Sequence, residues 1–182
     1  MIKKVIAAIL GALLALCVAM LIKHGSVDHL KYSLGLWDKE AARKEVLAAL
    51  DSFTQYYSKF FNTGGDLEGL GVFPAANLVK RRIVQDINAW TDQNLVLVYD
   101  KFGFEVESVE VLSPEKSLVV TKESWALMVR QRDNRSIGKG MQSLSMRVRY
   151  IFGREAGIWK VQEYEVYTID DDIQPFKERS GL

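Results

Sequence analysis

The stretch that decides the fold is Gly157-Ile158-Trp159-Lys160-Val161-Gln162-Glu163-Tyr164-Glu165-Val166-Tyr167. Apolar and polar residues alternate along most of it, which predicts a β-strand. Glu163 and Glu165 stand two residues apart, so a strand places both of them on one face. They form either an acid/base pair inside a pocket or the cover of an outer surface, and the strand before them decides between these alternatives.

Segment 141–153 predicts that neighbouring strand, because one face is apolar and the other polar. The apolar face holds Leu144, Met146, Val148, Tyr150 and Phe152. We expect a three-residue loop, Glu155 to Gly157, between the two strands. In that register Arg149 lies opposite Glu163. Two residues further along, Arg147 lies opposite Glu165, whereas a slip by one residue would set each charge against an apolar side chain.

The expected pairing favours a structural role for these charged residues. Opposite charges across two strands stabilise a sheet by about 0.2–1 kcal/mol for each pair. An arginine partner also keeps a carboxylate ionised, which is the opposite of what a general acid needs. We therefore predict a structural charge ladder, although Trp159 and Val161 fall on the same face and make it less than uniformly polar. The ladder consists of Arg147, Arg149, Glu163 and Glu165.

The remaining elements predict an α+β fold. A helix begins after the N-cap Asp38 and ends at 62–65, and a second helix begins near Pro74. Alternating strands follow at 104–112, 118–130, 141–153 and 157–168, after a short apolar run at 95–99 that fits either structure. This order indicates two or three helices packed on one face of a curved, cone-like antiparallel sheet of four or more strands.

The N-terminal part of the chain predicts a transmembrane anchor. Residues 5–22 form a run of eighteen residues without a charge or a strongly polar side chain. As a helix this run is roughly 27 Å long, close to the thickness of a bilayer's hydrocarbon core. A cleaved signal peptide has a shorter apolar core, and a lipoprotein signal places a small residue before its cysteine, whereas Leu16 precedes Cys17 here. An uncleaved anchor fits better than either.

This anchor defines the expected layout and location. Residues 1–4 form a cytoplasmic tail, 23–37 a juxtamembrane connector, 38–170 the folded domain and 171–182 a polar tail. Lys3 and Lys4 adjoin the first apolar turn, which favours a cytoplasmic N-terminus, although more basic residues follow the segment than precede it. We expect a protein of the bacterial inner membrane with its domain in the periplasm.

The order of elements, together with Arg149-Tyr150-Ile151-Phe152 and Gly157-Ile158-Trp159-Lys160-Val161, resembles the nuclear transport factor 2-like superfamily over about residues 38–169. The resemblance implies a bent sheet wrapped over helices, with an open mouth. Its members include isomerases, cyclases and non-catalytic binding domains. A single anchor before such a domain is similar in layout to the inner-membrane assembly subunit of type IV secretion systems, whose cytoplasmic tail is longer. It is also similar to partner-binding domains of chloroplast division proteins.

The chemistry available to the domain is limited. His24 and His29 lie in the connector and the only cysteine is Cys17, so histidine- or cysteine-based nucleophiles and ordinary zinc sites are excluded from 38–170. We expect no cofactor and no metal. An isomerase-like site would need a carboxylate and a tyrosine in a dry pocket. The residues of that type are Glu163, Glu165, Tyr164, Tyr167, Glu123 and Tyr99.

Charge is balanced overall, with 24 Lys+Arg and 23 Asp+Glu, but it is segregated along the chain. Residues 128–154 hold seven basic residues and one acidic residue, and 155–182 hold seven acidic and three basic ones. Adjacent strands that neutralise each other explain much of this. The alternative is a docking patch for an acidic protein or anionic headgroups, made of Arg130, Arg132, Arg135 and Lys139.

These observations favour a membrane-anchored, non-enzymatic interaction module of a multi-subunit cell-envelope complex. Its expected partners are the lipid bilayer and other protein subunits, with self-association through edge strands as a further option and no nucleic acid. The alternative is a small-molecule binder, or an isomerase- or cyclase-like enzyme, that uses a carboxylate and a tyrosine in the cone pocket.

Overall fold

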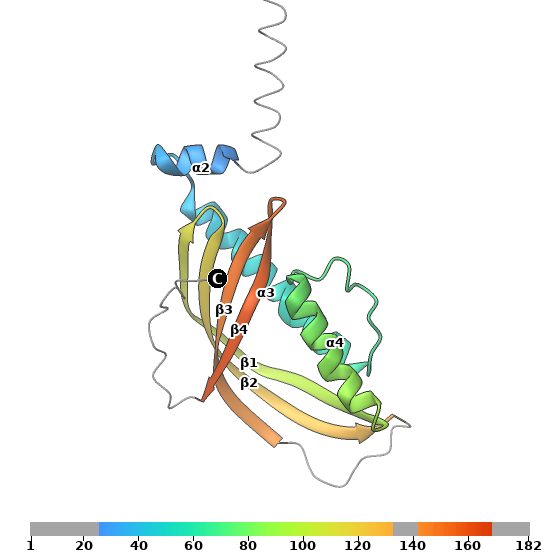
Figure 1. The fold of residues 1–182 in the computed structure, drawn as a ribbon. Helices are drawn as coiled ribbons and strands as arrows, with labels where there is room; N and C mark the ends of the chain where they lie inside the picture. The colour runs from blue at the N-terminus through green and yellow to red at the C-terminus, as the bar shows by residue number, and fades with distance from the viewer. Residues whose placement is uncertain (1–25, 133–141, 169–182) are drawn as a thin grey trace, which may run out of the picture.

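A computed structural model describes residues 26–132 and 142–168 of the 182-residue chain. Three helices pack on a curved, four-stranded antiparallel sheet of order β1-β2-β3-β4, which confirms the expected fold class (Figure 1). None of the described helices has the length and apolar character needed to cross a bilayer. The expected anchor, 5–22, lies outside the described residues. The elements are α2 (Ser26–Ser33), α3 (Lys39–Asn62), α4 (Asn77–Thr91), β1 (Leu95–Ser113), β2 (Lys116–Gln131), β3 (Gln142–Glu155) and β4 (Ile158–Thr168).

The main helix, α3, begins and ends where the sequence predicts. The side chain of Asp38 accepts a hydrogen bond from the backbone N–H of Ala41 at 2.9 Å, which satisfies one of the free donors of the first turn. After Asn62 the chain turns at Gly64, whose φ is +64°. The apolar stripe of α3 faces the sheet and forms the core with α4, and its fully buried members include Val46, Leu50, Phe53 and Phe60.

The structure adds one helix to the expected helical part and moves the start of another. The connector expected at 23–37 contains a helix, α2, which ends in a turn around Gly35 with φ +70°. The second helix begins at Asn77 rather than near Pro74. Residues 74–76 run along β4 instead, where the Val161 N–H donates to the Pro74 carbonyl and the Ala76 N–H donates to the Val161 carbonyl, both at 2.9 Å. These hydrogen bonds occupy the outer edge of β4 and keep residues 74–76 extended, so α4 begins only at Asn77.

The apolar run at 95–99 and the strand expected at 104–112 are one continuous strand, β1. Register shifts between Lys101 and Gly103 and between Val106 and Ser108 interrupt its alternation, which explains why the sequence suggests two elements. At the outer edge of β1, the side-chain amide of Asn62 donates to the Tyr99 carbonyl at 2.9 Å and accepts from the Tyr99 N–H at 2.6 Å. The end of α3 therefore covers part of this sheet edge.

The last hairpin has a different register from the one expected. Its turn contains two residues, Ala156 and Gly157, with φ of +51° and +81°, as in a type I′ turn. The register then shifts between Ile151 and Phe152, where β4 carries the extra residue Gln162. Because of this bulge, Trp159 and Val161 turn into the core, and the glutamates stay on the outer face. The mixed face that simple alternation predicts does not occur.

Candidate functional site

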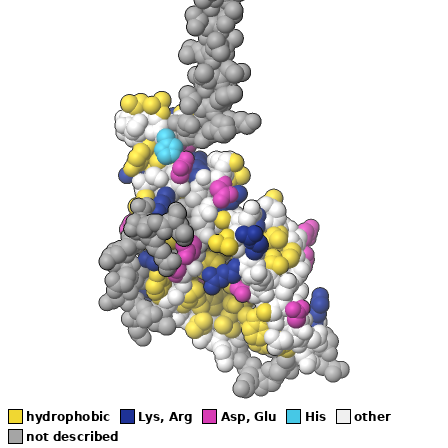
Figure 2. All heavy atoms as spheres, in the orientation of Figure 1, with side chains coloured by type: hydrophobic (Ala, Val, Ile, Leu, Met, Phe, Trp, Pro, Cys, Tyr) yellow, Lys and Arg dark blue, Asp and Glu magenta, His cyan; other side chains and the backbone are white. Residues whose placement is uncertain are grey.

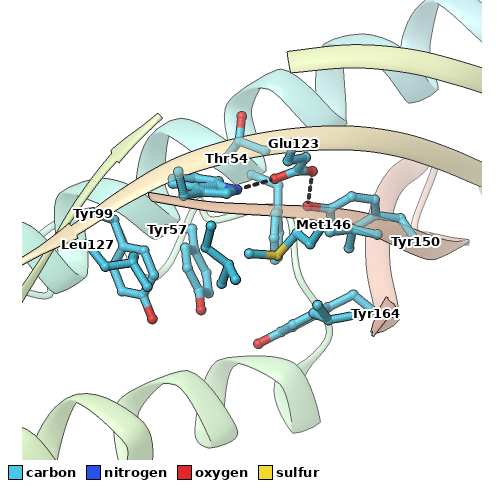
Figure 3. Close-up of a pocket in the computed structure, with 13 residues that line it drawn as sticks. Thr54, Tyr57, Tyr99, Glu123, Leu127, Met146, Tyr150 and Tyr164 are labelled. Atoms are coloured by element: carbon cyan, nitrogen blue, oxygen red, sulfur yellow. Dashed lines mark hydrogen bonds between the residues drawn. The ribbon is translucent and has the colours of Figure 1, made fainter. Parts of the chain in front are cut away.

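The concave side of the sheet forms a pocket with α3. The cavity has a volume of about 190 Å³ and a mainly apolar lining. Phe53, Thr54 and Tyr57 enter it from α3, and side chains of all four strands complete it (Figure 3). The strand residues are Tyr99, Glu123, Trp125, Leu127, Leu144, Met146, Val148, Tyr150, Tyr164 and Val166. A benzene-sized group needs a cavity of about 150 Å³, so the pocket can hold a small apolar ligand or one end of a longer one.

A buried carboxylate, Glu123, lies at the inner end of this pocket. Only 1 % of its surface is exposed. Oε1 accepts hydrogen bonds from the Tyr150 hydroxyl at 2.8 Å and the Thr121 hydroxyl at 2.7 Å. Oε2 accepts from the indole N–H of Trp125 at 2.8 Å (Figure 3). Thr121, Glu123 and Trp125 alternate on one strand, so the pleat of β2 aims all three side chains at the same space.

This arrangement engages most of the carboxylate's acceptor sites. A carboxylate has about four such sites, and three of them hold donors here. A general base needs an oxygen within reach of a substrate proton, and Oε1 is already shared between two hydroxyls. The described contacts therefore favour a structural role for Glu123, while the apolar walls leave ligand binding open.

The charge of Glu123 influences its neighbours. Burial raises the pKa of Tyr150 well above its ordinary value, and the adjacent negative charge of Glu123 adds to this effect. Lys101, on β1, donates to the Thr54 hydroxyl at 3.1 Å, and its ammonium lies 4.1 Å from the ring centroid of Phe104. Burial lowers the pKa of Lys101, while the charges of Glu123 and Asp51 act in the opposite direction. Lys101 is thus a cation that interacts electrostatically with the buried carboxylate.

Three tyrosines, Tyr57, Tyr99 and Tyr164, form a second polar group in the pocket, and Figure 3 shows their hydroxyls directed to the same side. Burial is the main cause that raises the pKa of each one. Tyr57 is affected most, because its two tyrosine neighbours also raise its pKa. All three are neutral hydrogen-bond donors at physiological pH, a property suited to a ligand with a carbonyl or hydroxyl group.

The buried tyrosines predict a loss of stability at alkaline pH. A pKa raised above the unfolded value means that the folded state holds the phenolic proton more tightly. These tyrosines therefore do not lower the free energy of unfolding below about pH 10. Above that pH, the free energy of unfolding falls by about 1.4 kcal/mol per pH unit for each such tyrosine. Tyr57→Phe should reduce this slope by about 1.4 kcal/mol per pH unit. Urea unfolding of both proteins from pH 9 to 11 measures it, and equal slopes would contradict the assignment.

The carboxylates and tyrosines considered for an isomerase-like site fall into two groups. Glu123, Tyr99 and Tyr164 line the pocket, as such a site requires. Glu163, Glu165 and Tyr167 lie on the outer face of β4, and the Tyr167 hydroxyl donates to Glu165 at 2.5 Å. The glutamate pair of the opening stretch is therefore not in the pocket.

The charge ladder is formed only in part. Arg149 lies opposite Glu165, not Glu163, and forms an ion pair with it through Nε at 2.9 Å. Arg147 lies opposite Tyr167 and pairs instead with Glu107 of β1 at 3.1 Å. Glu163 faces Ile151 across the strands and is exposed. The shorter turn and the bulge move the register by two residues at this point, which breaks both expected pairs.

The expected docking patch is described only for its first two members. The Arg130 guanidinium donates to the Asn62 carbonyl at 3.1 Å, at the C-terminus of α3, and its side chain is half-buried. A cation at that position complements the helix dipole. Arg132 is exposed, and its backbone N–H donates to Asn94 at 3.0 Å. Arg135 and Lys139 lie outside the described residues, so the patch stays a prediction, with Arg130 directed toward the fold.

Sequence analysis missed the role of Arg154, at the end of β3. Its guanidinium pairs with Asp28 of α2 at 2.8 Å and with Glu45 of α3 at 3.1 Å. The indole N–H of Trp159 donates to the same Glu45 oxygen at 3.1 Å, and the guanidinium lies 5.6 Å from the Trp159 ring centroid. No local sequence pattern predicts the contact between Arg154 and Asp28, which are 126 positions apart. Among the described residues, no three His, Cys, Asp or Glu side chains gather as a metal site.

Comparison with known proteins gives a likeness of fold. No protein-family model matches the chain, and no curated protein matches its sequence. The chain is similar to the crystal structure of the intermembrane space region of chloroplast protein ARC6, with a TM-score of 0.57, 16% identity, and coverage of 72% of this chain and 97% of that one. At this identity the likeness shows the fold alone.

Two further solved structures are similar at lower scores. One is an NTF2-like protein of unknown function from Prochlorococcus marinus, with a TM-score of 0.43, 17% identity, and coverage of 71% of this chain and 94% of that one. The other is CagV of Helicobacter pylori, a VirB8 homolog of a type IV secretion system, with a TM-score of 0.37, 12% identity, and coverage of 68% and 99%. Both scores are too low to support an argument about this chain.

Proposed function

We propose that this chain is a non-enzymatic interaction and assembly module of a multi-subunit cell-envelope complex. Residues 5–22 anchor it in the bacterial inner membrane, with residues 1–4 in the cytoplasm and the domain in the periplasm. Its partners are the lipid bilayer and other protein subunits. The domain is of the nuclear transport factor 2-like kind that the sequence resembles.

The observation that carries this proposal is the layout of the chain. An uncharged segment of eighteen residues precedes a domain whose fold also occurs in the intermembrane space region of chloroplast protein ARC6. The pocket chemistry supports the non-enzymatic part, because Glu123 is engaged by Tyr150, Thr121 and Trp125. A free catalytic carboxylate is not found among the pocket's described residues.

Purification of the native full chain in mild detergent, after crosslinking in cells, tests the assembly role. We expect defined heteromeric products that contain the chain and at least one other envelope subunit. A lone monomer without any crosslinked partner would contradict the proposal. An alkaline phosphatase fusion after Leu182 tests the topology separately: an active reporter is expected, and an inactive one would reverse the orientation.

A second candidate function is the binding or isomerisation of a small molecule in the pocket. The open apolar cavity of about 190 Å³, with a carboxylate and tyrosines in its wall, favours it. A screen of small cyclic ketones by thermal shift tests this function. A shift that Tyr57→Phe and Tyr164→Phe abolish, and that the outer-face variant Glu163→Gln preserves, would support it. No shift with any probe would leave the assembly role as the better account.

A further inference from the structure

The short helix α2 has two faces with opposite character. Successive residues of a helix are rotated by about 100°, so positions 28 and 32 lie on the side opposite positions 30 and 34. Asp28 and Tyr32 face the domain. Asp28 pairs with Arg154, and the Tyr32 hydroxyl donates to the Leu112 carbonyl at 3.2 Å. The helix is therefore held in a fixed orientation. It lies at the end of the sheet where the turn between β1 and β2 and the turn between β3 and β4 are found (Figure 1).

The other face of α2 presents leucines to solvent. Leu30 is 57% exposed and Leu34 is 62% exposed. The helix ends in a Schellman turn, in which the Leu36 N–H donates to the Lys31 carbonyl at 2.7 Å across Gly35. The residue after the glycine in this turn often packs against the helix, but Leu36 is 71% exposed. Figure 2 shows the resulting hydrophobic surface on the side of α2 away from the sheet.

The charged residues of α2 are also distributed between the face turned to the domain and the face that carries the leucines. Asp28 is the only carboxylate of the helix and is turned to the domain, where Arg154 binds it. Lys31 is exposed. His29 pairs with Glu115 at 2.8 Å and connects the helix to the turn between β1 and β2. An apolar face bordered by a basic residue, with the acidic group turned away, is typical of a helix that lies in a membrane interface.

The length of the chain fixes how far this face can be from a bilayer. The uncharged run ends at Ile22, and α2 begins at Ser26, four Cα–Cα steps later. Four steps span at most about 15 Å. A bilayer's polar interface is several Å thick on each side of the hydrocarbon core. If residues 5–22 cross the membrane, α2 must therefore begin in or next to the interface.

We propose that α2 and the turn after it dock on the surface of the lipid bilayer, with Leu30, Leu34 and Leu36 inserted at the headgroup–acyl boundary. This inference rests on the proposed function, because it requires the anchor. The contacts of Arg154, His29 and Tyr32 then hold the sheet in a fixed orientation relative to the membrane. The docked helix sets the tilt of the domain and the direction in which its pocket opens.

Fluorophore labels placed at single cysteines in the full chain test this docking. In a Cys17→Ser background, Leu30→Cys, Leu34→Cys and Leu36→Cys each carry an environment-sensitive label, and the chain is reconstituted in liposomes of phosphatidylcholine and phosphatidylglycerol. Leu78→Cys and Phe102→Cys are matched controls, because Leu78 and Phe102 are 68% and 62% exposed on the domain and do not lie at the hairpin turns next to α2. Brominated lipids should quench the α2 labels at least about threefold more than the controls.

Each other outcome has a defined meaning. Equal quenching at α2 and control positions, with equal access for aqueous iodide, would overturn the docking. Labels shielded from iodide but not quenched by brominated lipid would also overturn it, because a protein surface would then cover the leucines. Alkaline carbonate extraction of the same liposomes reports on the anchor separately: release of the chain would reject the proposed function, and retention without quenching would reject the docking alone.

Discussion

Replacing Glu123 with alanine should lower the free energy of unfolding by about 3 kcal/mol. The substitution removes the common acceptor of the Tyr150 hydroxyl, the Trp125 indole N–H and the Thr121 hydroxyl. A buried donor left without an acceptor costs about 1–3 kcal/mol, and water that enters through the pocket recovers part of this. Glu123→Gln should lower the free energy of unfolding by less than Glu123→Ala, because its amide keeps one acceptor oxygen. Some loss remains, since the amide presents an N–H₂ group to one of the donors.

The matched control for Glu123 is Glu163→Ala, which removes the same kind of side chain from the outer face of the same sheet. Glu163 is exposed and makes no ion pair with the described residues, so its loss should change stability by less than about 0.5 kcal/mol. Urea unfolding of the full chain in mild detergent, followed by tryptophan fluorescence, measures both variants. Equal effects at the two positions would show that the buried network does not hold the inner end of the pocket.

Replacing Arg154 with alanine should release α2 from the domain. Arg154 joins Asp28 to Glu45, and it stacks over Trp159 at 5.6 Å. A helix of eight residues is not stable alone in water, so its protection depends on these contacts. Both acidic partners are partly exposed, which reduces the electrostatic contribution, and we expect a loss of about 1–3 kcal/mol. The amides of α2 should then exchange about tenfold to a hundredfold faster.

Arg147→Ala is the corresponding control on β3. Arg147 also forms an ion pair, with Glu107 at 3.1 Å, but that pair joins β3 to β1 across β2 and does not reach α2. Hydrogen exchange of residues 26–33 in both variants separates the two roles. Unchanged exchange in Arg154→Ala, or equal acceleration in Arg147→Ala, would show that the guanidinium of Arg154 does not hold the helix.

Glu123 and Arg154 differ in how far the sequence could reveal their roles. Glu123 stands between Thr121 and Trp125 on the face of β2 that also holds Val119 and Leu127, so its alternation marks it as inward-facing. Its donors could only be partly anticipated, because Tyr150 comes from a strand 27 residues away. For Arg154 nothing local distinguishes it from Arg147 or Arg149. Its importance depends on which elements meet at the end of β3.

Sequence by itself determined the class of fold, the N-cap at Asp38, the apolar stripe of α3 and the positions of β2, β3 and β4. These features depend on local periodicity and capping, which act within a few residues. Only the tertiary structure decided the register of the last hairpin and the partners and exposure of its two glutamates. The choice between a two- and a three-residue turn, and the bulge at Gln162, moved Glu165 opposite Arg149 and left Glu163 in solvent. Burial of Trp159 and Val161 against the helices stabilises that bulge, and such a long-range gain cannot be seen in strand alternation.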